Sequence, residues 1–128
     1  MADTEKVTIN MSVVDLGQID LLVEEGFYSS RTDFIRTAIR NLLINHSEVV
    51  KQSVVRKSMA IGAMTFSRGD LERTLAGGEM VEIRVVGLLD LDRSITPELA
   101  RATIKSIKVM GVLRASDAVK AALADRIS

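Results

Sequence analysis

The chain has no cysteine and no tryptophan, and its 128 residues include one proline and one histidine. Without cysteine it can form neither a disulfide nor a thiolate metal site. The lone histidine, His46, is typical of a structural position on a helix. Asp90 and Asp92 could suggest a cation, but two acids without further ligands favour a solvated loop. With no Ser/His/Asp set and no phosphate-binding glycine loop, the sequence predicts no enzyme, no metal and no cofactor.

Long apolar runs and an excess of one charge are also missing. The run 59–66 is far shorter than the roughly 20 residues that a membrane span needs. The polar residues 1–6 carry no apolar segment, so no secretory signal is expected. The 17 cations balance 17 anions, whereas proteins that coat nucleic acid nonspecifically are usually basic. We therefore expect a cytoplasmic protein without membrane contact, whose nucleic-acid contact, if any, uses a small face.

A period of 24 residues runs through the C-terminal part of the chain. Leu-Ala pairs begin at positions 75, 99 and 123, and residues 83–89 match residues 107–113 at the same offset. A weaker upstream copy aligns four residues with Ile83, Val85, Gly87 and Leu88: Met59, Ile61, Ala63 and Met64. Repeats of about 20–29 residues that combine a strand and a helix are typical of solenoids.

Each repeat unit predicts a strand followed by a short helix. The expected strands are 59–66, 82–91 and 105–114, and the expected helices are 70–76, 97–103 and 117–126. Nearly continuous apolar runs indicate strands buried on both faces, as in a parallel sheet. Gly87 and Gly111 share one repeat position, which Ala63 takes in the first copy, and small residues there indicate close backbone approach. A compact βαβαβα domain with fortuitous similarity is the alternative.

The last repeat has no polar capping unit. Its strand, 107–113, is apolar enough for an interior position, and an uncovered strand edge invites pairing with another chain. We therefore expect residues 59–128 to self-associate, with end-to-end stacking as one form.

The N-terminal part does not share this period. Residues 6–11 alternate between polar and apolar, which predicts a strand with one buried face. A single short strand is not stable alone, and no second strand follows nearby. The simplest partner is the same strand of another copy.

Two helices are expected after this strand. Ser12 is a fair N-cap for the first, and Gly26 is suited to end it. Ser30 caps the second, with Asp33 three residues later. The apolar spacing of the second helix continues toward residue 57, with a break near residues 45–47 as the alternative.

A strand, a helix and the segment "G-F-Y-S-S-R-T-D-F-I-R-T-A-I-R" at this distance resemble the ribbon-helix-helix DNA-binding family of the Arc, MetJ and CopG type. The resemblance covers residues 5–46. The predicted fold is thus mixed α/β: a ribbon-helix-helix dimerisation module over residues 1–50, then a small α/β domain of three 24-residue strand-helix repeats over residues 51–128, a short solenoid-like parallel sheet.

The resemblance implies that two chains pair their strands into an antiparallel ribbon in the major groove of double-stranded DNA. Base edges would then be read by Lys6, Thr8 and Asn10. A backbone phosphate would be held at the start of the second helix by Ser29, Ser30 and Arg31. The alternative for the strand is an ordinary solvated face. Arg36 and Arg40, one turn apart on the second helix, would contact the DNA backbone or form ion pairs within the helix or across the dimer.

The leading hypothesis is a sequence-selective transcriptional regulator, in particular a repressor, associated with the nucleoid. It would be a homodimer through the N-terminal strands and a higher homo-oligomer through residues 59–128. The alternatives are an architectural, filament-forming scaffold anchored to DNA, and an antitoxin of a toxin-antitoxin pair.

Overall fold

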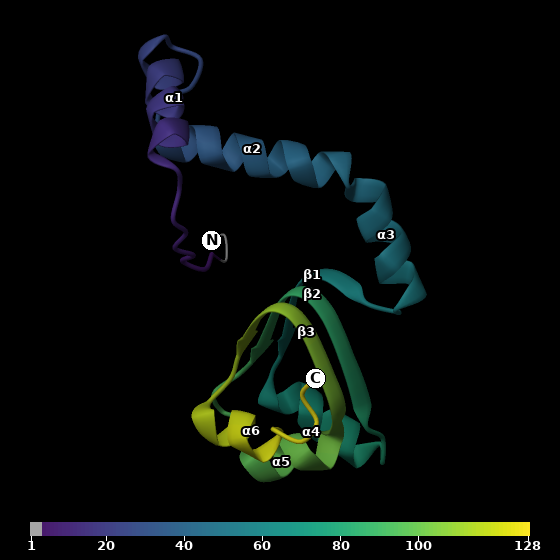
Figure 1. Ribbon diagram of the computed structural model, residues 1–128. Coiled ribbons are helices and arrows are strands. Elements are labelled where there is room, and N and C mark those ends of the chain that lie inside the picture. The colour runs from purple at the N-terminus through teal and green to yellow at the C-terminus, as the bar shows by residue number, and fades with distance from the viewer. Residues whose placement is uncertain (1–3) are drawn as a thin grey trace. The chain divides into compact units, whose positions relative to one another are not determined.

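The computed structural model in Figure 1 describes residues 4–128. Residues 1–3 of the predicted module 1–50 lie outside the described part. The described chain divides into two compact units, residues 4–53 and residues 54–128. Among the described residues, no helix has the length and apolar character that crossing a membrane requires.

The N-terminal unit is helical, and the expected caps define its helices. The helices are α1 (Val13–Glu24), α2 (Arg31–Asn45) and α3 (Ser47–Arg56), the last of which continues into the second unit. The hydroxyl of Ser12 accepts a hydrogen bond from the N–H of Asp15 at 3.4 Å, and that of Ser30 accepts from the N–H of Asp33 at 3.0 Å. Both side chains satisfy helix donors that otherwise have no partner.

Gly26 ends α1 as expected. Its φ of 85° is in the left-handed region that favours glycine. The N–H groups of Gly26 and Phe27 donate to the carbonyls of Val23 and Leu22, which is the Schellman arrangement. The second apolar run is not one helix: α2 ends at Asn45, and α3 begins at Ser47. Of the two interpretations, the one with a break is therefore right.

The C-terminal unit is a mixed α/β structure with a parallel sheet, as predicted. Its strands are β1 (Ala60–Phe66), β2 (Val81–Leu91) and β3 (Ile104–Arg114), paired in the order β1-β2-β3. Its helices are α4 (Arg68–Ala76), α5 (Pro97–Thr103) and α6 (Asp117–Ala122). In Figure 1 the three strands bend over together, and the three helices lie side by side across the open side of the bend.

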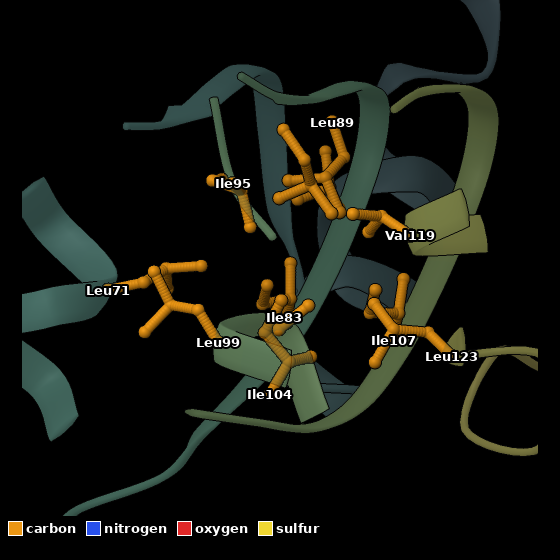
Figure 2. Close-up of a cluster of buried hydrophobic side chains, with 12 residues drawn as sticks. Leu71, Ile83, Leu89, Ile95, Leu99, Ile104, Ile107, Val119 and Leu123 are labelled. Carbon is orange, nitrogen blue, oxygen red and sulfur yellow. The ribbon is translucent and has the colours of Figure 1, made fainter. Parts of the chain in front are cut away.

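The core lies between the bent sheet and these helices. Its buried residues are aliphatic, and the partly buried Phe66 packs against them. Figure 2 shows side chains from the strands meeting side chains from the helices and the loop before α5. The fully or almost fully buried members include Leu71, Ile83, Leu89, Ile104, Ile107 and Leu123. The prediction of burial on both faces is wrong, because alternate residues of β2, such as Val86 and Leu88, face outward and are only half-buried.

Three glycines form a column across the bend of the sheet. Gly62, Gly87 and Gly111 are register partners with φ of 126°, 135° and 127°. A Cβ on Gly87 would lie 2.2 Å from the carbonyl oxygen of Gly62, and one on Gly111 would lie 2.0 Å from that of Gly87. The prediction that Ala63 occupies this position is wrong, because only glycine fits both the φ and the contact.

The first repeat is therefore shifted by one residue. Ala60 pairs with Val85, an offset of 25, whereas Val85 pairs with Val109, an offset of 24. The upstream alignment of Met59, Ile61, Ala63 and Met64 with Ile83, Val85, Gly87 and Leu88 is wrong by that residue. The glycine column, rather than the apolar pattern, determines which residues lie side by side.

The helical parts of the repeats keep the 24-residue period at one position and lose it at another. Leu71, Ile95 and Val119 are all buried, as one shared phase requires. Of the Leu-Ala pairs, however, Leu75 is 50% exposed while Leu123 is fully buried. The helical parts thus differ in how they meet the core.

Candidate nucleic-acid interface

The segment before α1 carries the predicted base-reading residues. Residues 4–10 are exposed, including Lys6, Thr8 and Asn10. The apolar side chains that alternate with them are exposed too, with Val7 at 78% and Ile9 at 68%. This segment joins none of the strands found in residues 4–128. Its apolar side chains therefore have no core to enter within one copy of the chain.

The helices of the same unit also leave their apolar side chains uncovered. Within residues 4–53 the only buried hydrophobic residue is Ile19, at 5% exposure. Exposed large apolar residues lie on α1, on α2 and between them: Val13, Val14, Leu21, Phe27, Ile39, Leu42, Leu43 and Ile44. Exposed apolar surface on this scale indicates a contact with another molecule.

The turn between the two helices is fixed by an aromatic pair. The rings of Tyr28 and Phe34 meet edge to face, with centroids 4.9 Å apart and planes at 85°. This is the favoured geometry for two aromatic rings. It holds the residues just before α2 against the first turn of that helix.

The start of α2 contains Ser29, Ser30 and Arg31, the predicted phosphate site. The Ser30 hydroxyl is engaged as the helix cap, and the Ser29 N–H donates to the carboxylate of Asp33 at 2.9 Å. The N–H groups of Arg31 and Thr32 open the helix and have no acceptor among the described residues. They are aimed out of the positive end of the helix dipole, where an anion is stabilised.

Arg31 has a partner that the sequence did not reveal. Its guanidinium donates from Nε to Oδ1 of Asp20 at 2.7 Å and from Nη2 to Oδ2 at 2.8 Å. This planar, two-point pair ties α2 to α1. The hydrogen bond from Arg31, reinforced by its charge, holds the pKa of Asp20 below its usual range, and Asp20 raises the pKa of Arg31 in turn.

Two further cations lie on α2. Arg36 and Arg40 are exposed and one turn apart. Within the described part of the chain, neither forms an ion pair, so the intrahelical pairing considered from the sequence is not present. Both guanidinium groups are available to a phosphate or to a second copy.

A basic hollow lies on the C-terminal unit. A pocket of about 400 Å³ is lined by Lys57, Arg84, Ser106, Ile107, Lys108 and Ser128. Arg84 donates to the backbone carbonyl of Lys57 at 3.3 Å. Over residues 4–128, no cluster of three or more His, Cys, Asp or Glu side chains is arranged to hold a metal ion.

A segment of alternating polarity, a capped helix, a glycine turn and a second capped helix are the parts of one half of a ribbon-helix-helix module. The model of the Ribbon-Helix-Helix transcriptional regulator family matches residues 2–120, so the chain belongs to that family. The match extends well beyond residues 5–46, where the sequence first showed the resemblance. No curated protein and no solved structure matches the chain.

Proposed function

We propose that the protein is a sequence-selective, DNA-binding transcriptional regulator whose N-terminal unit works as a homodimer. The single observation that carries this proposal is the exposure of the unit's apolar side chains, of which only Ile19 is buried within one copy. Pairing residues 6–11 of two copies into an antiparallel ribbon gives Val7, Ile9 and Met11 a core formed with the helices of both copies. Burial of this surface supplies the free energy for dimerisation.

The opposite edge of the ribbon then faces DNA. Lys6, Thr8 and Asn10 alternate with the apolar residues, so all three point to the same side of a strand. Lysine donates to guanine O6 and N7, asparagine pairs with adenine through two hydrogen bonds, and threonine contacts thymine or hydrogen-bonds a base edge. Two strands supply six such side chains to one major groove.

A backbone phosphate is held at the start of α2. The free N–H groups of Arg31 and Thr32 donate hydrogen bonds to the anion, while Ser29 and Ser30 shape the turn that presents them. When DNA binds, Arg31 either turns from Asp20 toward the phosphate or keeps its pair with Asp20. The variant Asp20→Asn separates these two states. Arg36 and Arg40 add positive charge along the same helix.

With a single cation on each strand, one dimer gains little attraction to phosphates. The C-terminal unit compensates by joining dimers into a larger homo-oligomer. Several ribbons then engage neighbouring half-sites at a high effective concentration. We also propose that the repeats form a solenoid-like structure and that the protein is a repressor. Its proposed location is cytoplasmic and associated with the nucleoid.

The test compares Asn10→Ala with Asn41→Ala in the full-length protein. Asn41 is an exposed asparagine on α2 and serves as the matched control. On an operator selected from random DNA, Asn10→Ala should weaken binding by about 1–3 kcal/mol, while the mass of the oligomer stays unchanged. Asn41→Ala should bind like the parent. Parent-like binding by Asn10→Ala contradicts the assignment of the ribbon.

The length of the DNA footprint separates regulation from scaffolding. Discrete protected sites at selected operators support the regulator. Continuous protection that spreads from one site at rising protein concentration supports the filament-forming scaffold instead.

A further inference from the structure

The sheet of the C-terminal unit has two edges, β1 and β3, and the part of the chain that the structure describes adds no strand beyond either one. The two edges differ in length and in what covers them. β1 has seven residues, whereas β2 and β3 have eleven each. Because of this difference, the edge of β1 can be compared with the part of the β3 edge that remains uncovered.

The first part of β3 is covered by the chain's own C-terminal residues. The N–H of Ile107 donates to the carbonyl of Arg126, and the N–H of Ser128 donates to the carbonyl of Ile107, both at 2.9 Å. Both backbone groups of Ile107 are therefore hydrogen-bonded to these C-terminal residues. Beyond Ile107, residues 109–113 of β3 have β2 on one side and no described strand on the other.

β1 lacks the part of the strand that the tail covers on β3. Its first residue, Ala60, is in register with Val85, which is in register with Val109. No residue of β1 corresponds to residues 81–84 of β2. β1 therefore begins in the same register as the part of β3 that the tail leaves open.

The contacts between the glycines also make the edge of β1 fit the edge of β3. Gly87 packs on the carbonyl of Gly62, and Gly111 packs on that of Gly87. A strand added beyond β3 must therefore place glycine against the carbonyl of Gly111. β1 has Gly62 at that position, and the space that a Cβ of Gly62 would enter is empty.

From these fits we propose that β1 of one copy stacks on β3 of the next, parallel and head to tail. Gly111 meets Gly62 of the next copy, Met110 meets its Ile61, and Val112 meets its Ala63. This inference rests on the proposed self-assembly and specifies its partner surfaces. Such a heterologous contact uses different patches on the two copies, so it builds open chains or rings rather than a closed pair.

The outer face of the sheet supports the same register. Ile61, Val86 and Met110 form an apolar row beside the glycines, and its end members are 59% and 43% exposed. Stacking makes this row continuous from copy to copy. An antiparallel β1–β1 pair would leave β3 open and would not repeat the glycine contact, which depends on strands running in the same direction.

Disulfide trapping in the full-length chain tests the register. Because the protein has no cysteine, only introduced residues can react. Within one copy, positions 61 and 110 are separated by β2, about 10 Å apart, which is too far for a disulfide. In the proposed stack, Met110 of one copy and Ile61 of the next are about 5 Å apart, within disulfide range.

Full-length Ile61→Cys and Met110→Cys proteins are mixed under mild oxidation. The expected product is a mixed disulfide dimer, and the double variant should give a ladder of dimers, trimers and larger species. Leu75→Cys, at an exposed position of α4, replaces Ile61→Cys in the control and should give only background. Dimers from Ile61→Cys alone would show β1–β1 pairing and overturn the inference.

Mass measurement on the same samples tests self-assembly separately from the head-to-tail register. Species larger than a dimer without the disulfide between positions 61 and 110 would overturn the head-to-tail register and leave self-assembly intact. A mass that never exceeds the dimer would overturn both. Binding to a single operator depends on neither cysteine position and reports on the ribbon separately.

Discussion

In the proposed function, two anions compete for the charge of Arg31: a DNA phosphate and the carboxylate of Asp20. As the first residue of α2 it is proposed to contact a DNA phosphate, yet its guanidinium is paired with Asp20 in one copy of the chain. Because the pKa of Asp20 is held below its usual value, the carboxylate stays charged through neutral and mildly acidic solution. Acid breaks the pair only as the pH falls through that lowered value.

Asp20→Asn should therefore release Arg31 to the DNA. We expect tighter binding at low salt and a slope of log affinity against log salt that is steeper by about 1 for each released arginine. Glu24→Gln removes the same charge from an exposed site on α1 and is the matched control. Salt titrations of DNA binding measure both variants, and an identical slope for the two would exclude Arg31 from the phosphate site.

The residues whose roles are local can be predicted from the sequence. Ser12, Ser30 and Gly26 act on backbone groups a few positions away, so their spacing was enough to predict their roles. The pairing of Asp20 with Arg31 depends on how two helices pack, and no spacing rule reveals it. Pairing of Lys6, Thr8 and Asn10 with DNA stays a prediction at this scale.

At the scale of the elements, the glycine column decides the register of the sheet. An apolar pattern tolerates a shift of one residue, whereas a glycine with positive φ packed against a carbonyl does not. The 24-residue period therefore predicted the pairing of β2 with β3 correctly and missed the first strand by one position. Burial of the sheet on one face only could not be predicted either, because residue type alone does not distinguish a half-buried valine or leucine from a fully buried one.

Gly87→Ala and Gly62→Ala isolate the steric part of this column. Both substitutions put a side chain at a positive φ, which costs about 1–3 kcal/mol. Within one copy, only the new Cβ at Gly87 would also meet a carbonyl oxygen, at 2.2 Å, so the two variants are compared at concentrations too low for copies to assemble. Urea denaturation should therefore show a clearly larger loss of stability for Gly87→Ala. Equal losses at the two positions would contradict the close packing of the glycines.

At the scale of the whole molecule, the two units take different parts in the proposed function. The N-terminal unit is incomplete as a single copy, because its apolar side chains are exposed. The C-terminal unit has its own core and two complementary edges. In the proposed function, dimers recognise half-sites and the sheet connects those dimers.

Ile61→Lys should separate recognition from assembly. A lysine in the apolar row at the β1 edge opposes strand addition, so we expect parent-like affinity for one operator. Affinity for two adjacent operators should fall by about 10²-fold as cooperativity is lost. Quantitative footprinting measures both, with Leu75→Lys as the control at an exposed site of α4. Cooperativity that survives Ile61→Lys but not Leu75→Lys would point to the helices as the contact surface.

Pairing of residues 6–11 between two copies is tested most directly by amide hydrogen exchange on the full-length protein. In a ribbon, alternate N–H groups of this segment are hydrogen-bonded to the partner strand, so they should exchange slowly. Protection should fall on dilution below the dimer dissociation constant and in Ile9→Lys. Exchange at the rate of an unstructured peptide, at concentrations where the protein is a dimer, would contradict the ribbon.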